Sequence, residues 1–201
     1  MKKGLLKRFL LLALWAGAAR AQGLQNTDIA VLFGTVWNTS NAIPGTNLTL
    51  ASSSLFTAQD DFGYQVVRAS AASLWVDASV IWGTAGTLTA NVPGSGSTKW
   101  TAGTAGVRFM VPVNSRLSFY AVTGAGGGNF RAVAVVGGSN PSISTYSTDH
   151  GVFAFGGGAD VRIWRWLSLR ADIRDWVTGR ELSGTAGRQH LVPSVGFGFH
   201  F

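Results

Sequence analysis

The sequence predicts an all-β protein, an eight-stranded antiparallel up-and-down β-barrel, on three observations. Apolar residues recur at every second position in eight segments, which is the side-chain period of a strand with one apolar face. The connections are rich in Gly, Ser, Thr and Asn, and short connections alternate with long ones. Beyond the amino terminus, the sequence has no continuous apolar run of the roughly 18 residues that a transmembrane helix needs.

The amino terminus has the three parts of a secretory signal peptide. A basic start precedes a short apolar core, from Phe9 to Trp15, and the small-x-small sequence at residues 19–21 follows it. The core is shorter than the roughly 20 residues of a transmembrane helix. The sequence therefore predicts a signal peptide at 1–21, cleaved after Ala21, and one barrel domain at 22–201.

The charge and cysteine content exclude several classes of protein. The net charge is +7, but five of the 16 basic residues lie in the signal peptide and all nine acidic residues lie beyond it. The predicted mature chain then carries a net charge of +2, which gives no support for a nucleic-acid partner. The chain has no cysteine, so it holds no disulfide, thiolate metal site or lipid anchor on a cysteine.

The alternation defines each strand in turn. The eight predicted strands span residues 29–37, 55–68, 74–82, 100–112, 117–130, 151–164, 167–177 and 191–201. The first strand has an apolar face from Ile29 to Trp37, whereas the second has no clear phase. The third strand has Leu, Val, Ala, Val and Trp on one face, and its other face contains Asp77. The fourth alternates Val107 and Phe109 around Arg108.

The later strands follow the same rule. The fifth begins with Leu117 and Phe119, and the sixth sets Phe, Ala, Val and Ile against Gly residues and Asp160. The seventh alternates Leu, Ala and Ile with Ser, Arg and Asp. The predicted short connections are 69–73, 112–116 and 165–166, and the predicted long ones are 38–54, 84–98, 131–148 and 179–188. This pattern is typical of outer-membrane barrels, with short periplasmic turns and long outer loops.

The last strand has aromatic residues at alternate positions: Phe197, Phe199 and Phe201. This aromatic end resembles the assembly signal of bacterial outer-membrane barrels, and Gly63-Tyr64-Gln65 is a second local similarity. By its pattern, the segment 27–201 resembles the small eight-stranded OmpA- and OmpX-like transmembrane domains. The resemblance implies a bacterial outer-membrane location, contact with outer-membrane lipid and lipopolysaccharide, and insertion by the barrel-assembly machinery through the C-terminal strand. The OmpA-like periplasmic domain is not expected.

Charged residues mark the inner face. Seven of them fall on the phase opposite to the apolar one: Asp77, Arg108, Asp160, Arg162, Arg170, Asp172 and Arg174. An Arg or Lys facing lipid at the membrane centre costs about 2–4 kcal/mol, so this face points inward. The interior of an eight-stranded barrel is just wide enough for side chains. The residues therefore predict an interior plugged by ion pairs, with a narrow pore as the alternative. Inward glycines of the fifth and sixth strands leave room for bulky groups such as Tyr120.

Three tryptophans fall where the strands end. Trp37 and Trp82 lie at the outer ends of the first and third strands, and Trp166 lies at a predicted periplasmic turn. Amphipathic aromatic rings favour the membrane interface. These residues predict an aromatic girdle.

No constellation for catalysis, a cofactor or a metal emerges from the sequence. The three histidines have no paired ligand spacing. His150 and His190 lie near outer loops rich in serine, which leaves a lipid A or phospholipid hydrolase barrel as an alternative. A second alternative is a soluble lipocalin-like barrel whose apolar face lines a ligand cavity. The sequence favours a non-catalytic barrel with a structural or surface-interaction role in its outer loops, whose extracellular partner it does not identify.

Overall fold

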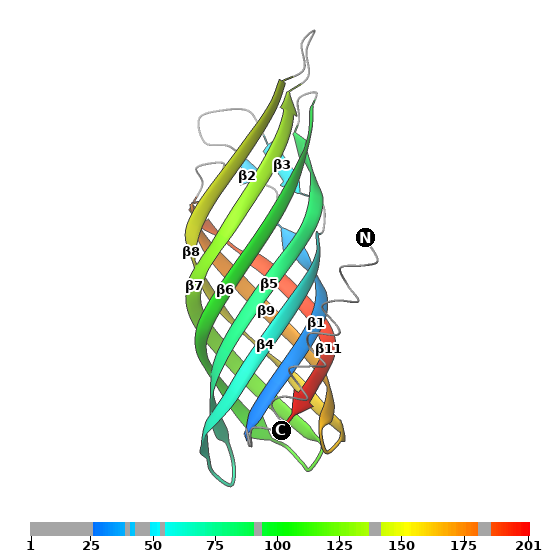
Figure 1. Cartoon of the computed structure of the whole chain (residues 1–201), viewed down its shortest axis with the longest axis vertical. Helices are drawn as coiled ribbons and strands as arrows, with labels where there is room; N and C mark the ends of the chain where they lie inside the picture. The colour runs from blue at the N-terminus through cyan, green and yellow to red at the C-terminus, as the bar shows by residue number, and fades with distance from the viewer. Residues whose placement is uncertain are drawn as a thin grey trace.

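The computed structural model describes residues 26–38, 41–42, 49–52, 55–90, 94–136, 142–180 and 186–201. They form a closed, all-antiparallel barrel of eight long strands, with three short strands toward one end (Figure 1). The predicted fold class is confirmed. The predicted signal peptide, residues 1–21, lies outside the described residues. Within the described part of the chain, no helix is long and apolar enough to cross a membrane.

Each barrel strand pairs with its neighbour in the chain, and the last pairs with the first. The barrel strands are β1 (Thr27–Asn38), β4 (Leu55–Arg68), β5 (Ser73–Ala90), β6 (Gly94–Pro112), β7 (Leu117–Val136), β8 (Ser142–Trp164), β9 (Leu167–Arg180) and β11 (His190–His200). The short strands are β2 (Asn41–Ala42), β3 (Thr49–Ser52) and β10 (Ala186–Arg188). The β1–β11 pairing runs from Asp28↔His200 to Asn38↔His190, and this closure removes the open sheet edges.

The structure resolves the phase of the second barrel strand. On β4, Phe56, Phe62 and Tyr64 are exposed on the outside, whereas Gln59 and Asp61 are buried inside. The outward residues continue the apolar exterior of the neighbouring strands, because β4 pairs with both β1 and β5. An interior carboxylate therefore lies on a strand that sequence alternation left unassigned.

Two of the predicted long loops are largely strand. β5 continues to Ala90 and β6 begins at Gly94, so little of the predicted loop 84–98 remains. The predicted loop 131–148 is shortened in the same way, because β7 reaches Val136 and β8 begins at Ser142. Backbone pairing between neighbouring long strands satisfies their hydrogen bonds, and many residues in these segments are β-branched. The Ser and Thr content that indicated loops is thus carried by hairpins that extend one end of the barrel (Figure 1).

Short turns and the carboxyl terminus occupy the opposite end. At one turn, the Asn114 side chain accepts hydrogen bonds from the backbone N–H groups of Arg116 and Leu117. Asn26, with a φ of 73°, donates its backbone N–H to the carbonyl of Phe201. Asn is among the few residues that adopt this left-handed conformation readily. The alternation of short turns at this end with long hairpins at the other is the pattern that the sequence predicts for the periplasmic and outer sides.

Candidate functional site

The lower half of the barrel interior is crossed by buried ion pairs that meet at Asp28. Nη2 of Arg108 lies 2.6 Å from one carboxylate oxygen of Asp28, and Nη2 of Arg170 lies 2.7 Å from the other. Asp28 comes from β1, whereas the two arginines come from β6 and β9. All three side chains are fully buried. Asp28 therefore ties β1 to two strands that it does not pair with in the sheet.

Arg174 forms a second centre. Its Nη2 lies 2.6 Å from Oδ2 of Asp61, and its Nε lies 3.0 Å from Oδ2 of Asp172. Nη1 donates to the Ser79 hydroxyl at 2.6 Å, and that hydroxyl donates to Asp77 at 3.0 Å. These contacts join β9 to β4 and β5. These contacts offset the cost of removing the Arg174 guanidinium from water.

The two centres form one network. Nε of Arg108 lies 3.2 Å from Oδ2 of Asp77, which also faces Arg174. The Tyr120 hydroxyl donates to Asp172 at 2.6 Å, and the Tyr120 ring lies against the guanidinium groups of Arg108 and Arg170, 5.8 and 5.5 Å from the ring centre. Stacked aromatic rings are favourable neighbours for desolvated guanidinium groups.

Glycines leave the space that these side chains fill. A Cβ added at Gly158 would lie 2.6 Å from the Tyr120 hydroxyl, and one at Gly63 would overlap the guanidinium of Arg108. At Gly198 the added atom would lie 2.7 Å from Oγ of Ser168. Close packing of the network therefore depends on the absence of side chains at these inward positions.

Six of the seven predicted interior charges are buried in this network. They are Asp77, Arg108, Asp160, Arg170, Asp172 and Arg174. Arg162 departs from the prediction, because it is exposed near the end of β8 and takes part in none of the ion pairs found among the described residues. It lies opposite Ser168 in the β8–β9 pairing, two residues from the end of β8, where its side chain is exposed. Asp28 and Asp61 belong to the network but were not among the predicted residues.

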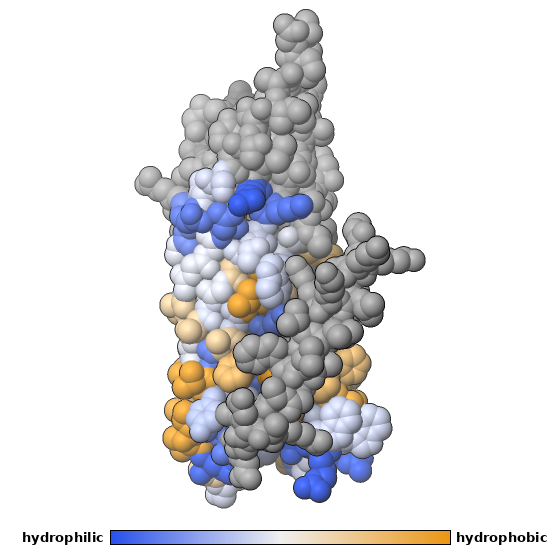
Figure 2. Space-filling view, in the orientation of Figure 1, coloured by the Kyte–Doolittle hydropathy of each residue, from blue (hydrophilic) through white to orange (hydrophobic). Residues whose placement is uncertain are grey.

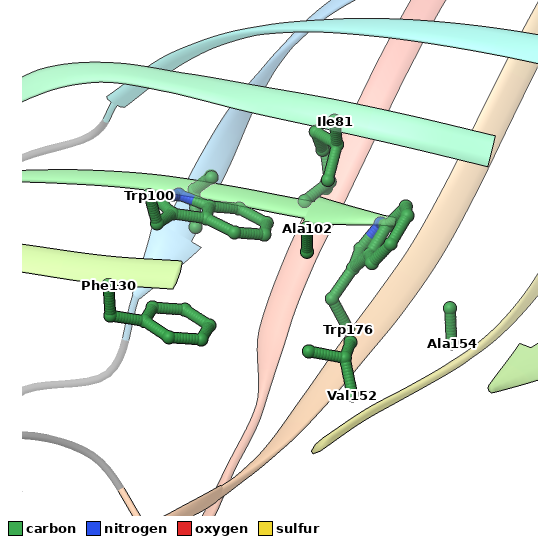
Figure 3. Packing of buried hydrophobic residues seen from close by; sticks show 9 residues of the cluster. Ile81, Trp100, Ala102, Phe130, Val152, Ala154 and Trp176 are labelled. Atoms are coloured by element: carbon green, nitrogen blue, oxygen red, sulfur yellow. The ribbon is translucent and has the colours of Figure 1, made fainter. Parts of the chain in front are cut away.

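An apolar cluster occupies the interior above the ion pairs, toward the outer end. Trp176 of β9 and Trp100 of β6 lie edge to face with their ring centres 6.2 Å apart, and Phe130 of β7 stacks on Trp100 at 5.9 Å (Figure 3). The His190 ring stacks on Trp100 at 5.4 Å. The remaining members are small or aliphatic residues: Val36, Ile81, Ala102, Val152, Ala154 and Val192. The alternation did not indicate this second, apolar layer inside the barrel.

A Ser–His–Asp contact occurs at the end of the barrel that carries the short turns. Ser168 donates its hydroxyl to Oδ2 of Asp160 at 2.8 Å, and Nε2 of His200 lies 2.9 Å from the same hydroxyl oxygen and 3.6 Å from Oδ1 of Asp160. In a catalytic triad, one ring nitrogen takes the serine proton while the acid binds the other nitrogen. Here a single nitrogen faces both groups, and Ser168 is fully buried. This arrangement anchors the end of β11 and lacks the geometry that activates a nucleophile.

The two histidines of the hydrolase alternative lie apart from this contact. Nε2 of His190 lies 3.4 Å from the Thr178 hydroxyl. Nε2 of His150 is buried with no hydrogen-bond partner among the described residues. The contact of His190 with Thr178 is not the serine–histidine pair that the alternative requires, and His150 forms no such pair through Nε2 among the described residues. Within the part of the chain that the structure describes, no group of three metal-binding side chains occurs.

Aromatic side chains lie near both ends of the apolar exterior. Trp37 is 58% exposed on β1, and Trp82 occupies the outward phase of β5. At the other end, Trp166 stacks between Trp164 and Phe199, with ring centres 6.1 and 6.2 Å apart. Figure 2 shows hydrophobic residues on the lower part of the visible face, and hydrophilic ones at its lower end and in a belt across its upper part.

Solved structures share this architecture at low sequence identity. Neisserial surface protein A matches with a TM-score of 0.54 and 16% identity, over 88% of this chain and 98% of that protein. OprG from Pseudomonas aeruginosa matches with a TM-score of 0.57 and 13% identity, over 87% and 96%. Ail, the attachment invasion locus protein of Yersinia pestis, matches with a TM-score of 0.50 and 15% identity, over 87% of this chain and 96% of that protein. No protein-family model and no curated protein sequence matches the chain. The chain has the fold of the small eight-stranded outer-membrane β-barrels.

Proposed function

We propose that this protein is a bacterial outer-membrane barrel that acts as a rigid, non-conducting scaffold and carries its biological role in its outer loops. The observation that carries the proposal is the pairing of Asp28 with both Arg108 and Arg170, because these bonds cross the interior between strands that are not neighbours. An eight-stranded barrel has no room for both such a network and a water-filled channel. The apolar cluster around Trp176 forms a second barrier above it.

The exterior supports a membrane location. Large apolar side chains face outward along the strands, among them Phe62, Phe109, Phe119, Phe155 and Ile173. A soluble lipocalin-like barrel would place such residues inside and charges outside. This barrel has the reverse arrangement, with arginines and aspartates buried inside and apolar side chains outside. A barrel surrounded by lipid needs such an apolar outer face.

The location has a direct test. We expect the mature protein to begin at Gln22, after signal cleavage, and to fractionate with outer membranes. The measurement is amino-terminal sequencing of protein extracted by detergent from separated inner and outer membranes. Recovery of the mature chain in the soluble periplasm without detergent would contradict the proposal.

The end of β11 provides the proposed assembly signal. Phe197 is exposed on the lipid-facing side, and Phe199 and Phe201 lie further along at the rim. We expect Phe201→Ser to lower the amount of barrel in outer membranes of cells while the refolded variant keeps its unfolding midpoint. The substitution preserves the backbone N–H of Phe201, which donates to the carbonyl of Thr27. Unchanged membrane levels would show that the barrel-assembly machinery does not read this residue.

The proposal includes the absence of catalysis. The contact among Ser168, His200 and Asp160 is explained as an anchor for the last strand, since the hydroxyl is buried and donates to the carboxylate. We expect purified protein to release no fatty acid from lipid A or phospholipid in mixed micelles. Release that disappears in His150→Ala or His190→Ala would instead support the hydrolase alternative.

The outer loops are the proposed site of recognition. Polar loops on a rigid frame are common sites of binding. Two proteins of similar fold are named Neisserial surface protein A and attachment invasion locus protein. The short strands β2, β3 and β10 lie in the segments predicted as outer loops, 38–54 and 179–188. We propose that these segments and the hairpin ends contact an extracellular surface.

A further inference from the structure

The buried network contains more acids than bases. Its carboxyl groups belong to Asp28, Asp61, Asp77, Asp160 and Asp172, and its guanidinium groups belong to Arg108, Arg170 and Arg174. With every group charged, five negative charges face three positive ones, an excess of two. His200, at the end of β11, lies 3.6 Å from Asp160, and its protonation matches at most one of the two. At least one negative charge is therefore unmatched unless an acid of the network carries a proton.

No other buried Lys or Arg matches this charge among the residues whose burial the structure describes. Every other Lys or Arg there is exposed, including Arg162, which has the inward phase. His190 is buried, but it lies in the apolar cluster, where it stacks on Trp100. A metal ion also lacks a site, since the described residues contain no group of three metal-binding side chains. A buried carboxylate without a matching charge is costly, and such a group becomes neutral by taking up a proton.

The contacts within the network single out Asp77. Each of the other four acids accepts a hydrogen bond from a guanidinium group, at 2.6 to 3.0 Å. Asp77 has weaker contacts: Nε of Arg108 lies 3.2 Å from Oδ2 without forming a hydrogen bond, and Nη1 of Arg174 lies 3.8 Å from Oδ1. The Ser79 hydroxyl donates to Oδ1, whereas Oδ2 is buried with no hydrogen-bond partner among the described residues. Asp77 is therefore the acid whose negative charge the network stabilises least.

We infer that Asp77 binds a proton and is a neutral carboxylic acid in the folded barrel at neutral pH. Asp28 and Asp61 face it with like charge, and each accepts a hydrogen bond from an arginine at 2.6 Å. Where carboxyl groups share a site, the one with the weakest contacts to cations takes the proton. With Asp77 neutral, four negative charges face the three guanidinium groups and His200. The other titratable groups packed in the network are Arg108 of β6, Tyr120 of β7, Asp160 of β8, and Asp172, Arg170 and Arg174 of β9.

The bound proton couples the stability of the barrel to pH. A free aspartate is ionised above about pH 4, so unfolding at neutral pH releases the proton from Asp77. The folded state then binds one proton more than the unfolded state, and stability falls as the pH rises. The stabilisation is fully present below about pH 4 and is lost once the folded barrel releases the proton.

Infrared spectroscopy of the refolded full barrel in detergent at neutral pH tests the proton directly. The unchanged protein should show the C=O stretch of a neutral carboxylic acid, and Asp77→Asn should lose it. Asp149→Asn is the matched control, because it neutralises an exposed acid of β8 and should keep the band. The absence of the band from the unchanged barrel would overturn the inference without recourse to a variant. A band that persists in Asp77→Asn would also overturn it.

Urea unfolding provides a second readout. Asn has the size and hydrogen-bonding capacity of a neutral Asp, so Asp77→Asn should unfold at the same urea concentration as the unchanged protein or at a higher one. Asp172→Asn, which removes an ionised partner of Arg174, should unfold at a lower one. On acidification from neutral pH, the unfolding constant of the unchanged protein should fall more steeply than that of Asp77→Asn, by up to about tenfold per pH unit. Equal losses of stability in the two variants would show that Asp77 is ionised. Stability that changes when Na⁺ replaces K⁺ would indicate a bound cation in place of the proton, and would likewise overturn the inference.

Discussion

The Asp28→Ala substitution is expected to lower the free energy of unfolding by about 3–5 kcal/mol, the cost of leaving buried charges without their partner. Asp28 binds Arg108 through one oxygen and Arg170 through the other, and all three side chains are fully buried. Removing the carboxylate leaves two guanidinium groups short of an acceptor in a region that water does not reach. Each arginine keeps one other carboxylate nearby, Asp77 or Asp160, so the barrel should still form.

The measurement is urea unfolding of the refolded barrel in detergent micelles, followed by tryptophan fluorescence. Arg162→Ala is the matched control, because Arg162 has the same inward phase but is exposed at the rim. Its substitution should change stability by no more than about 0.5 kcal/mol. If the two variants unfold at the same urea concentration, the ion pairs of Asp28 do not stabilise the barrel.

The Trp176→Ala substitution is expected to cost about 3–5 kcal/mol through the cavity it leaves in the apolar cluster. Trp176 has no exposed surface and packs against Trp100 with ring centres 6.2 Å apart. Its indole Nε1 has no hydrogen-bond partner among the described residues, so the substitution breaks no side-chain hydrogen bond found there. Strands on both sides of the interior contribute to the cluster, which makes it hard for the walls to collapse into the space.

The control for this variant is Trp37→Ala, which removes the same side chain from an exposed position on β1. Unfolding in the same detergent should show a much smaller loss of stability for Trp37→Ala than for Trp176→Ala. Equal losses would mean that the interior cluster is loosely packed and that the cavity argument does not hold.

Side-chain alternation was enough to predict the barrel and most of its interior charges. Asp77, Arg108 and Arg174 each alternate with apolar neighbours, so a period of two places them on the inner face, where the structure buries them. Lipid makes this inference strong, because an outward arginine is costly. The same reasoning gives pairs between neighbouring strands, such as Asp160 with Arg170, which face each other in the β8–β9 register.

Two network residues escaped prediction for a local reason. Asp28 precedes the first residue of the predicted strand, and nothing before it extends the alternation. Asp61 follows Asp60, and two adjacent acids cannot both take the inner phase. The structure places Asp61 inside, whereas Asp60 has the outward phase between Val31 and Val80. The contact of Asp28 with Arg170 joins strands that are not neighbours in the sheet. Such a contact depends on the closed shape of the barrel, which alternation within one strand does not describe.

Depth along the barrel axis was the second quantity that alternation did not encode. Arg162 has the inward phase but lies at the rim, because phase says nothing about how far along the barrel a residue sits. The interior aromatic residues Trp100 and Trp176 show the same gap: their phase places them inside, but only the structure shows that they form one layer above the charges. The long hairpins were missed because Thr, which occurs throughout these segments, is β-branched and favours strands although it is also common in loops.

Single-channel recording tests the central claim most directly. The account predicts that the purified barrel, inserted in a planar lipid bilayer in concentrated KCl, produces no stable unitary current steps, because the network around Asp28 and Arg174 and the cluster around Trp176 fill the interior. Insertion is verified independently by protease protection of the same reconstituted sample. Stable, reproducible current steps from inserted, folded barrel would contradict the sealed interior and favour a narrow pore.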